Sequence, residues 1–567
     1  MSGGTLSWLW RALKGKKRNI AALLMVQVVL SICSIGYSLL FRGLIDRAVE
    51  HNRPGFWLFL GLLAGMALLQ LALRAFNRWL DEKTRSSVEN RFKLRLFETL
   101  LYREYASVTG VHTGEWMNRL TSDTLVVANG LAQIIPNLGG MLVRMVGALW
   151  VIMVLEPMFG TLLVPAGLVL IFVTRGFRPL LKRLHGKIQE SDGQVRVFLQ
   201  ERLDNLLIIS TFSQQNRALE LADERMDQHK KARMKRNHVS NISQVGFGTA
   251  IQGLYLAGAG FCCVGIMNGT VTYGTMTAVL QLIGHLQAPF SGISNYLTQW
   301  YGMIASAERL MEAEGYPLDT DGQILSGEEI QKYYRDEFAG FRLENVQFSY
   351  VDRTDGKERS VRVQYDDITF RKGEFVALAG RSGCGKSTLL KLLMCLYKPD
   401  CGNMWVLDNS GKTHHLSVWE RNLFAYVPQG NQLMSGKIRE VIAFYDAEKM
   451  HQDEEIWRAL KIACADEFVA RLPNGLDTLL GEHGSGLSEG QLQRIALARA
   501  IFSRRPVLLL DESTSALDEA TERQLLTNLR TMTDHTVLIV THRPQVCGSC
   551  DRILDLAAEA SDPSKEE

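Results

Sequence analysis

The chain has 567 residues, of which 46% are hydrophobic and 22% charged, and its formal net charge is +3. This composition excludes a disordered, a collagen-like and a disulfide-dense protein, and the length predicts two or more domains. The charge is unevenly distributed: residues 1–302 hold 32 Lys and Arg against 18 Asp and Glu, a net charge of +14, and the remainder carries −11. Whole-chain averages hide these two unlike halves, so they do not exclude a membrane protein.

The first half is built of long windows that contain no charged residue. Such windows lie between Arg18 and Arg42, Arg53 and Arg74, Glu156 and Arg175, and Arg236 and Glu308, and the interval from Asp123 to Glu156 holds only Arg144. A helix that crosses a bilayer needs about 20 largely apolar residues. The longest window holds two such helices, separated by the turn residues Asn268-Gly269-Thr270. We therefore predict six transmembrane helices, at 19–46, 55–80, 132–156, 158–180, 242–267 and 275–302.

The orientation of these spans follows from the basic residues. They gather before the first span and in the segments 74–119 and 175–236, whereas the alternate connectors are short and carry few. Because short loops rich in Lys and Arg stay in the cytoplasm, both termini and the second half of the chain are predicted to be cytoplasmic. The two long basic segments keep a helical apolar period, so we expect helices that extend well beyond the membrane.

The ends of the first half suggest a short helix and a linker. Trp8, Leu9, Ala12 and Leu13 share a helical face beside basic residues, which predicts an interfacial helix. The apolar run that follows is longer than that of a cleaved signal peptide. The chain turns acidic beyond the last span, so we expect a transmembrane domain over 1–303, a linker over 304–337 and a further domain over 338–567. Nine scattered cysteines fit a reducing compartment, and no second pair accompanies the single C-x-x-C at Cys547.

A phosphate-binding motif opens the second half. The segment 374–379, apolar after Glu374, predicts a buried strand, and the leucines that follow the motif predict a helix. Between them stands G-x-x-x-x-G-K-[ST], formed by Gly380, Arg381, Ser382, Gly383, Cys384, Gly385, Lys386, Ser387 and Thr388. Its glycines let backbone N–H groups surround phosphate oxygens, Lys386 adds a positive charge, and Ser387 offers an oxygen to Mg²⁺.

Two carboxylates follow a later apolar strand. Val507 to Leu510 is such a strand, and Asp511 and Glu512 come directly after it. The carboxyl ends of parallel strands share one edge of a sheet, so both side chains are expected beside the phosphate loop. We predict that Asp511 holds the Mg²⁺ shell and that Glu512 polarises the attacking water.

Taken together, residues 338–556 resemble the nucleotide-binding domain of an ABC transporter, and the six spans resemble the membrane domain of the exporter type. The most specific motif is Leu487-Ser488-Glu489-Gly490-Gln491, which matches the family's LSGGQ signature except at Glu489. The resemblance implies a helical transmembrane domain followed by an α/β P-loop ATPase domain with a helical subdomain. It also implies ATP and Mg²⁺ as the cofactors.

The resemblance assigns further site residues. Tyr350 matches the aromatic residue that stacks on adenine, Gln429 the glutamine that senses Mg²⁺ and the membrane domain, and His542 the histidine that contacts the γ-phosphate. Ser488, Gly490 and Gln491 would close over ATP held by a second chain. The segments 481–484 and 515–518 match the region before the signature and the loop that crosses to the partner domain. In the membrane half, 113–123 resembles the first intracellular loop.

One phosphate loop and one signature imply a dimer. Ser488 and Gln491 form an S-x-x-Q capping box, with Glu489 on the first turn of the helix. A carboxylate there suits the helix dipole but faces the triphosphate. If the Glu489 side chain faces the triphosphate, the ATP site that this signature closes is weakened, and the combination with an intact Glu512 and His542 resembles heterodimeric exporters. If the side chain turns away, a homodimer with two active sites is expected. Both arrangements stay open.

Polar residues inside the predicted spans mark the translocation path. Gln281 and His285 share a helical face near mid-bilayer, and Arg144 lies deep in the third span. Intramembrane ionisable residues usually face a cavity or a neighbouring helix. Arg144 thus suggests an anionic substrate, with interhelical hydrogen bonding as the alternative.

The sequence therefore predicts an ATP-driven half-transporter that exports an unidentified substrate. It would lie in the inner (plasma) membrane as a multi-pass protein, with the lipid bilayer and a second half-transporter as partners and no nucleic acid. One alternative is import of a metal chelate on the same architecture. Another is an ATPase that regulates a partner without transport.

Overall fold

The computed structural model describes residues 2–319, 327–352, 359–430, 432–481, 486–532 and 534–556. Its contacts divide the chain into two units, one of Met1–Thr99 with His112–Gly315 and one of Leu100–Val111 with Tyr316–Glu567. The short segment Leu100–Val111 therefore belongs to the second unit, although the sequence places it between helices of the first.

Six long helices cover the six predicted spans. They are α2 (Lys17–Val49), α3 (Arg53–Tyr102), α7 (Ile135–Leu155), α8 (Pro157–Asp204), α10 (Gln215–Met267) and α11 (Tyr273–Glu314). Within the described residues, α2, α3, α10 and the run Thr113–Leu155 are long and apolar enough to cross a membrane by length and composition. With 50 residues, α3 is about 75 Å long, far more than a bilayer requires. The prediction of spans with long helical extensions is confirmed.

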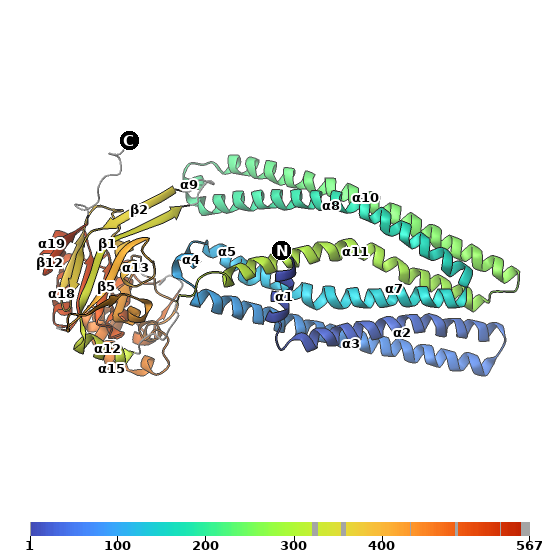
Figure 1. The fold of residues 1–567 in the computed structure, drawn as a ribbon, viewed down its shortest axis with the longest axis horizontal. Helices are drawn as coiled ribbons and strands as arrows, with labels where there is room; N and C mark the ends of the chain where they lie inside the picture. The colour runs from blue at the N-terminus through green and yellow to red at the C-terminus, as the bar shows by residue number, and fades with distance from the viewer. Residues whose placement is uncertain are drawn as a thin grey trace. The chain divides into compact units, whose positions relative to one another are not determined.

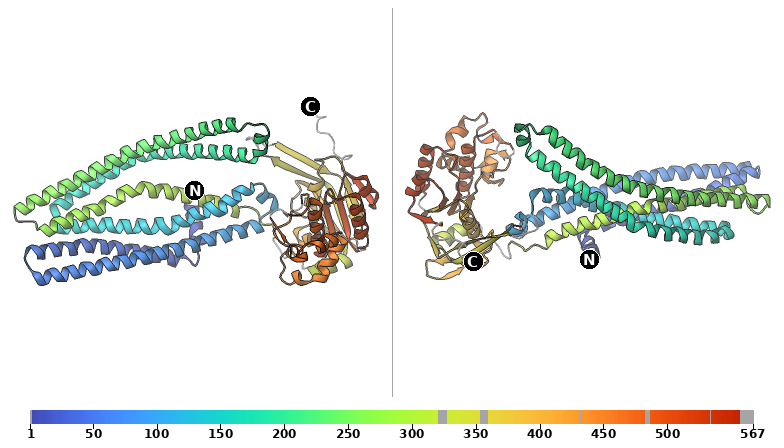
Figure 2. Two further views of the ribbon diagram at one scale, coloured as in Figure 1. Left: turned by 180° about the vertical axis from the view of Figure 1, so that it is seen from behind. Right: turned by 90° about the horizontal axis from the view of Figure 1, so that it is seen from above.

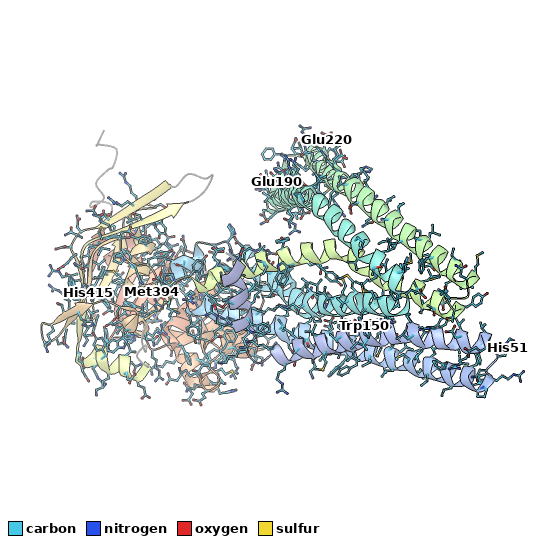
Figure 3. All side chains as sticks on the ribbon, turned by 45° about the vertical axis from the view of Figure 1, so that its right-hand side comes forward. His51, Trp150, Glu190, Glu220, Met394 and His415 are labelled. Carbon is cyan, nitrogen blue, oxygen red and sulfur yellow. The ribbon has the colours of Figure 1, made fainter. Side chains whose placement is uncertain are left out.

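The long helices are paired, and their connectors alternate between the two ends of the bundle. In Figure 1, α8 and α10 run side by side and are joined by α9 (Leu206–Thr211). Toward α9 this pair diverges from α7 and α11, as Figure 2 shows. Figure 3 places His51, at the turn between α2 and α3, at the opposite end of the bundle from Glu190 and Glu220. This alternation is the arrangement that six consecutive spans require.

Small and polar residues allow α2 and α7 to approach closely. Ser31 Oγ donates to the carbonyl oxygen of Gly140 at 2.7 Å, and Gln27 Nε2 donates to Asn137 Oδ1 at 2.9 Å. A Cβ added at Gly140 would lie 3.0 Å from Gln27 Cβ. Close packing of this kind, with polar side chains satisfied across the interface, is typical of membrane helices.

The N-terminal helix differs from the sequence expectation. A helix, α1 (Ser2–Ala12), does form, but Trp8 and Leu9 are only 6% and 2% exposed because they are covered by protein. The Trp8 ring lies 5.7 Å from the ring of Phe92, and its Nε1 donates to Glu314 Oε2 at 2.8 Å. The expected apolar face is therefore not left for the bilayer interface. Helix α1 packs on α3 and α11, where the indole N–H finds its hydrogen-bond acceptor.

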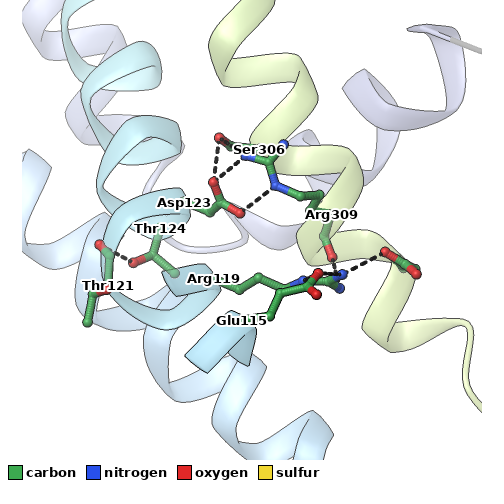
Figure 4. A network of polar contacts seen from close by, with 8 residues as sticks. Glu115, Arg119, Thr121, Asp123, Thr124, Ser306 and Arg309 are labelled. Atoms are coloured by element: carbon green, nitrogen blue, oxygen red, sulfur yellow. Dashed lines mark hydrogen bonds and ion pairs between the residues drawn. The ribbon is translucent and has the colours of Figure 1, made fainter. Parts of the chain in front are cut away.

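A buried polar network joins the segment that precedes the third predicted span to α11 (Figure 4). The chain runs through α5 (Thr113–Asn118), a π-helical turn η1 (Arg119–Asp123), α6 (Thr124–Asn129) and a second π-helical turn η2 (Gly130–Ile134). Asp123, 2% exposed, accepts hydrogen bonds from Ser306 Oγ and Arg309 Nε, both at 2.8 Å. Arg119 Nη1 donates to the carbonyl oxygen of Arg309 at 3.1 Å. These bonds offset the cost of burying the Asp123 carboxylate.

The second unit contains an antiparallel sheet that the sequence did not indicate. The strand order is β2-β1-β5-β6, with β3 also paired to β1. Its strands are β1 (Phe338–Asp352), β2 (Arg359–Tyr365), β3 (Ile368–Arg371), β5 (Cys401–Asp408) and β6 (Thr413–His415). Helix α12 (Gly327–Asp336) precedes it, so the expected linker 304–337 is partly helical: α11 reaches Glu314 and α12 covers its last third.

A parallel sheet follows, and it carries the predicted motifs. The order is β12-β4-β11-β10-β7, formed by β4 (Phe375–Ala379), β7 (Phe424–Val427), β10 (Val507–Asp511), β11 (Thr536–Val540) and β12 (Arg552–Asp555). Both β10 and β11 are fully buried. The helices of this part are α13 (Lys386–Leu393), α14 (Ile438–Ile442), α15 (Asp453–Ile462), α16 (Asp466–Arg471), α17 (Glu489–Phe502), α18 (Glu519–Arg530) and α19 (Pro544–Gly548), and a small ribbon pairs β8 (Gly436–Lys437) with β9 (Leu479–Leu480). The predicted α/β domain with a helical subdomain is confirmed.

Candidate nucleotide-binding site

The loop between β4 and α13 has the backbone of a phosphate loop. Gly380, Gly383 and Gly385 have φ values of 137°, 84° and 98°, a region that residues with a Cβ avoid. A Cβ at Gly385 would also lie 2.4 Å from Val363 Cγ1 and 2.7 Å from Tyr365 Oη. Glycine is therefore required at this position, immediately before the first turn of α13. The tip of the loop, at Arg381, Ser382 and Gly383, is exposed, and Cys384 is half-buried.

Lys386 is folded back over this loop. The residue is 6% exposed, and its Nζ donates to the carbonyl oxygens of Gly380 and Arg381, each at 2.9 Å. Within the described residues no carboxylate lies within ion-pair distance of Lys386. Its third contact is the Cys384 sulfur at 3.9 Å, so this buried ammonium is held by neutral groups and lacks a counter-charge. Together with the N-terminus of α13, it fits a phosphate group.

Ser387 and Asp511 meet across the sheet edge. Ser387 Oγ donates to Asp511 Oδ1 at 2.9 Å, and Tyr426 Oη donates to Asp511 Oδ2 at 3.1 Å. Asp511 is 2% exposed, and its burial raises the pKa of the carboxyl above the usual range, although both hydrogen bonds act in the opposite sense. A hydroxyl and a carboxylate oxygen side by side are the hard donors that Mg²⁺ prefers, so these residues fit that ion.

Glu512 stands at the centre of a second polar group. Gln429 Nε2 donates to Glu512 Oε2 at 2.8 Å, and His542 Nε2 lies 3.5 Å from Glu512 Oε1. The φ of Glu512 is 47°, in the left-handed region that non-glycine residues rarely adopt. Such strain persists only where surrounding structure enforces it, and it concentrates at functional sites. The three residues come from the ends of β7, β10 and β11, which lie side by side.

Tyr350 lies against the same loop. Its Oη is 2.8 Å from Thr388 Oγ1, and its ring packs edge to face on Phe348 and Tyr397, with centroids 4.9 and 5.7 Å away. The side chain assigned to adenine is thus joined to the last residue of the phosphate motif.

The signature begins α17, as predicted. Ser488 is the N-cap, Gln491 N donates to Ser488 Oγ at 3.4 Å, and Gln491 Oε1 accepts from Ser488 N at 2.9 Å, so the capping box is confirmed. A Cβ at Gly490 would lie 2.7 Å from the carbonyl oxygen of Ala516, so glycine is required there as well. Glu489 is exposed on the first turn.

The signature bonds Ser488 to Gln491, and among the described residues neither of the two bonds to the phosphate loop of the same chain. It contacts instead the loop after β10, through Gln493 of α17. Gln493 Nε2 donates to Ser515 Oγ, and Gln493 Oε1 accepts from Ala516 N, both at 3.1 Å. Of the segment expected before the signature, 482–484 lie outside the described residues.

Sequence reasoning missed two tyrosines of the site. Tyr426, three residues before Gln429, is a hydrogen-bond donor to Asp511. Tyr365 Oη donates to the carbonyl oxygen of Gly385 at 2.6 Å and supports the loop from β2. Tyr426 lies near the end of β7, which pairs with β10, so the strand order would have indicated its contact with Asp511. No sequence signal indicated the contact of Tyr365 with Gly385.

Comparison with known families matches both halves of the chain. Residues 20–290 match the family model described as ABC transporter transmembrane region. Residues 363–515 match the family model described as ABC transporter. The first match covers the part of the chain with the long helices, and the second lies in the part with the sheets and the phosphate loop.

Similar proteins match along most of this chain. An ATP-dependent lipid A-core flippase from Pasteurella multocida is 27% identical over 97% of this chain and 93% of its own length. The mitochondrial ATP-binding cassette sub-family B member 10 of Mus musculus is 29% identical over 85% of this chain and 66% of its own length. The structure of a bacterial Atm1-family ABC exporter with ATP bound superimposes with a TM-score of 0.79 and 21% identity, covering 96% of this chain and 94% of that one. This last likeness concerns the fold.

Proposed function

This chain belongs to the family of ABC transporters, as an ATP-driven exporter, and we propose that it works as one half of a dimer whose two chains complete each other's ATP sites. The observation that carries the dimer is the exposed signature. Ser488 and Glu489 lie at the surface, and the capping hydrogen bonds of Ser488 and Gln491 stay within the signature itself. A partner chain would bring its phosphate loop to this surface.

The triphosphate of ATP would bind to the Lys386 ammonium, which has no counter-charge in this structure, and to the N-terminus of α13. The triphosphate replaces the carbonyl contacts of Lys386 Nζ and takes hydrogen bonds from the N-terminus of α13. Tyr350 would turn its ring from Thr388 to the adenine. Ser387, Asp511 and Gln429 would hold Mg²⁺, which supplies charge neutralisation between the outer phosphates.

Hydrolysis would use the second polar group. Glu512 Oε2, now bonded to Gln429 Nε2, would accept a hydrogen bond from the attacking water and take its proton. His542, 3.5 Å from the other Glu512 oxygen, would orient this carboxylate and contact the γ-phosphate. The strained backbone of Glu512 supports this assignment, since it aims the side chain out of the sheet edge.

The test of this function is vesicle transport. Membrane vesicles with outward-facing ATPase domains should take up substrate only with ATP, and Glu512→Gln should abolish uptake while ATP still binds. Uptake into vesicles of the opposite orientation would contradict export. ATP hydrolysis that no candidate substrate alters would contradict transport.

For the dimer partner we propose a different half-transporter. Glu489 places a carboxylate where the signature meets the partner's triphosphate, while this chain keeps Glu512 and His542. Such a chain would provide one efficient hydrolytic site and receive a complete signature from its partner. Co-expression of tagged and untagged copies tests this. Recovery of untagged copies with the tagged ones, as a dimer that hydrolyses ATP, would establish a homodimer instead.

The expected location is the inner (plasma) membrane. The basic segments and the position of His51 opposite Glu190 and Glu220 support cytoplasmic placement of both termini and of the ATPase domain. A cysteine-accessibility experiment at the α2–α3 turn, compared with α9, would test this orientation.

A further inference from the structure

A polar cavity with three arginines lies in the membrane part of the first unit. It has a volume of about 210 Å³ and opens between α2, α3 and α7. Arg74 and Arg78 contribute from α3, one turn apart, and Arg144 contributes from α7. At about 30 Å³ per water in the liquid, this space accommodates roughly seven waters or a solvated anionic group.

These arginines have no carboxylate to face. None of the described residues that line the cavity is acidic, and no ion pair within the described part of the chain includes Arg74, Arg78 or Arg144. Farther along the same helix, Arg85 is by contrast paired with Glu82. Three like charges that converge on one cavity repel each other, so an anion in the cavity would relieve both the repulsion and the lack of partners.

Two buried polar atoms in the cavity lining point to the same conclusion. Arg144 Nε and Asn77 Oδ1 are inaccessible to solvent and have no hydrogen-bond partner in the described structure. A buried donor on a charged group is costly to leave unsatisfied. The planar guanidinium groups offer paired N–H donors that match the oxygens of a phosphate or a carboxylate.

A second cavity, of about 260 Å³, continues from the first. The two share Ser34 and Gln70, and the second is lined further by Tyr37, Gln281 and His285. Ser34 Oγ lies 3.3 Å from His285 Nε2, and Gln70 Nε2 donates to the carbonyl oxygen of Cys33 at 3.0 Å. Hydroxyl, amide and imidazole groups in this second cavity suit an uncharged ligand part that makes hydrogen bonds.

The depth of the cavities agrees with entry from the cytoplasmic side. Gln27 of the first cavity lies about 12 Å along the helix from the predicted cytoplasmic end of its span, and Arg74 about 9 Å from the end of its own. His285 of the second cavity lies about 25 Å from residue 302, near mid-bilayer. The charged cavity is thus the nearer of the two to the expected source of substrate.

We propose that Arg74, Arg78 and Arg144 bind the phosphate or carboxylate group of the exported substrate, and that the adjoining cavity binds an uncharged, hydrogen-bonding part of the same molecule. This inference rests on the proposed transport function and names its substrate class. Two sources share this chemistry, the headgroup of an anionic amphiphile in the inner leaflet and a water-soluble organic anion.

The test uses the full-length chain, in the dimer that it forms, in nanodiscs of zwitterionic phosphatidylcholine. The probes are dodecyl phosphate, glycerol phosphate and uncharged dodecyl maltoside. Two quantities are measured: the shift of the unfolding temperature without ATP, and the stimulation of ATP hydrolysis. The first reports binding even if the chain does not transport, so failure of the subsite and failure of the proposed function are distinguishable.

We expect dodecyl phosphate to raise the unfolding temperature and the ATPase rate. Arg144→Gln and Arg74→Gln should raise its half-maximal concentration about tenfold or more, since each removes a charge-assisted contact. Arg85→Gln, on the same helix but outside the cavity, is the matched control and should change it less than about twofold. Arg74 is exposed, so its variant remains informative if Arg144→Gln does not fold.

The outcomes separate the alternatives. A response to glycerol phosphate with the same variant dependence supports the subsite and identifies a water-soluble anion. A response to dodecyl phosphate alone supports the subsite and identifies a membrane amphiphile. Equal responses to dodecyl maltoside, no response to either phosphate, or unchanged half-maximal concentrations in both arginine variants would overturn the proposal.

Discussion

Tyr105 and Tyr397 pack ring on ring, with centroids 6.0 Å apart and planes tilted by 51°. Tyr105 opens the short helix α4 (Tyr105–Thr109), which follows the long helix α3, and Tyr397 lies just beyond α13 in the nucleotide-binding part. Tyr397 in turn contacts Tyr350, whose hydroxyl meets Thr388 of the phosphate loop. An ion pair between Glu104 and Lys398 lies beside this contact. A chain of packed rings therefore leads from the end of α3 to the nucleotide site.

From this contact we predict that Tyr105→Ala weakens coupling between transport and hydrolysis. Basal ATPase activity should stay within about twofold, because Tyr105 does not touch the phosphate loop, whereas the stimulation by substrate should fall. Tyr102→Ala, at a residue that is 60% exposed, is the control. Equal loss of basal and stimulated activity in Tyr105→Ala would contradict a coupling role and indicate general destabilisation.

Glu512→Gln should lower the ATPase rate by about 10²- to 10⁴-fold, the range expected when a general base is removed. Binding of ATP should persist, because Lys386 and Ser387 are untouched. Glu519→Gln, at an exposed carboxylate that pairs with Arg523, should leave the rate unchanged. Steady-state phosphate release and nucleotide trapping measure the two quantities. A Glu512→Gln protein with near-normal turnover would exclude this residue as the base.

Asp511→Asn should not destabilise the nucleotide-free protein at neutral pH. Burial raises the pKa of Asp511 above its unfolded value, so its ionised form costs stability above the folded-state pKa. The cost vanishes as the pH falls below the unfolded value of about 3.9. The variant should therefore unfold at an equal or higher temperature than wild type at pH 7, with the difference shrinking toward pH 4.

The same substitution should remove the stabilisation that Mg²⁺ adds to ATP. Unfolding temperatures measured with ATP plus Mg²⁺ and with ATP plus a chelator give this quantity directly. If Asp511→Asn kept a wild-type response to Mg²⁺, the ion would be held elsewhere.

Glu489→Gly should raise ATPase activity, because it removes a negative charge from the surface that faces the partner's triphosphate. The helix should lose about 1 kcal/mol, since glycine replaces a residue that suits the first turn. Glu489→Gln, which removes the charge and keeps the size, separates the two effects. An unchanged rate in both variants would mean that Glu489 does not impair the site.

Asp123→Asn should destabilise the first unit by about 1–3 kcal/mol, because Arg309 and Ser306 lose a charged acceptor in a buried place. The hydrogen bond to Asp123 raises the pKa of Arg309 in the wild type, and Arg309 stays charged in the variant because the ordinary pKa of arginine lies far above neutral. Asp227→Asn, in an exposed pair with Lys231, should cause no measurable change. Thermal unfolding in detergent compares them, and equal effects of the two substitutions would contradict the role of the buried network.

Much of the nucleotide site was predictable because its motifs are local. The strand before Gly380, the helix after Lys386 and the capping box at Ser488 each depend on residues a few positions apart. The meeting of Ser387 with Asp511 was predictable only because parallel strands end at one edge. The roles of Tyr426 and Tyr365 were not, since they depend on which strand lies beside which.

The sequence by itself determined the six helical spans and the ATPase motifs, because charge-free length and motif spacing are properties of short stretches of chain. The tertiary structure decided what meets across long separations. It buried the face of α1 that the sequence left for the membrane interface, and it turned Arg144 from an isolated charge into one wall of a cavity with Arg74 and Arg78. These contacts join residues some 70 to 300 positions apart. Helix packing, and not local periodicity, selects them.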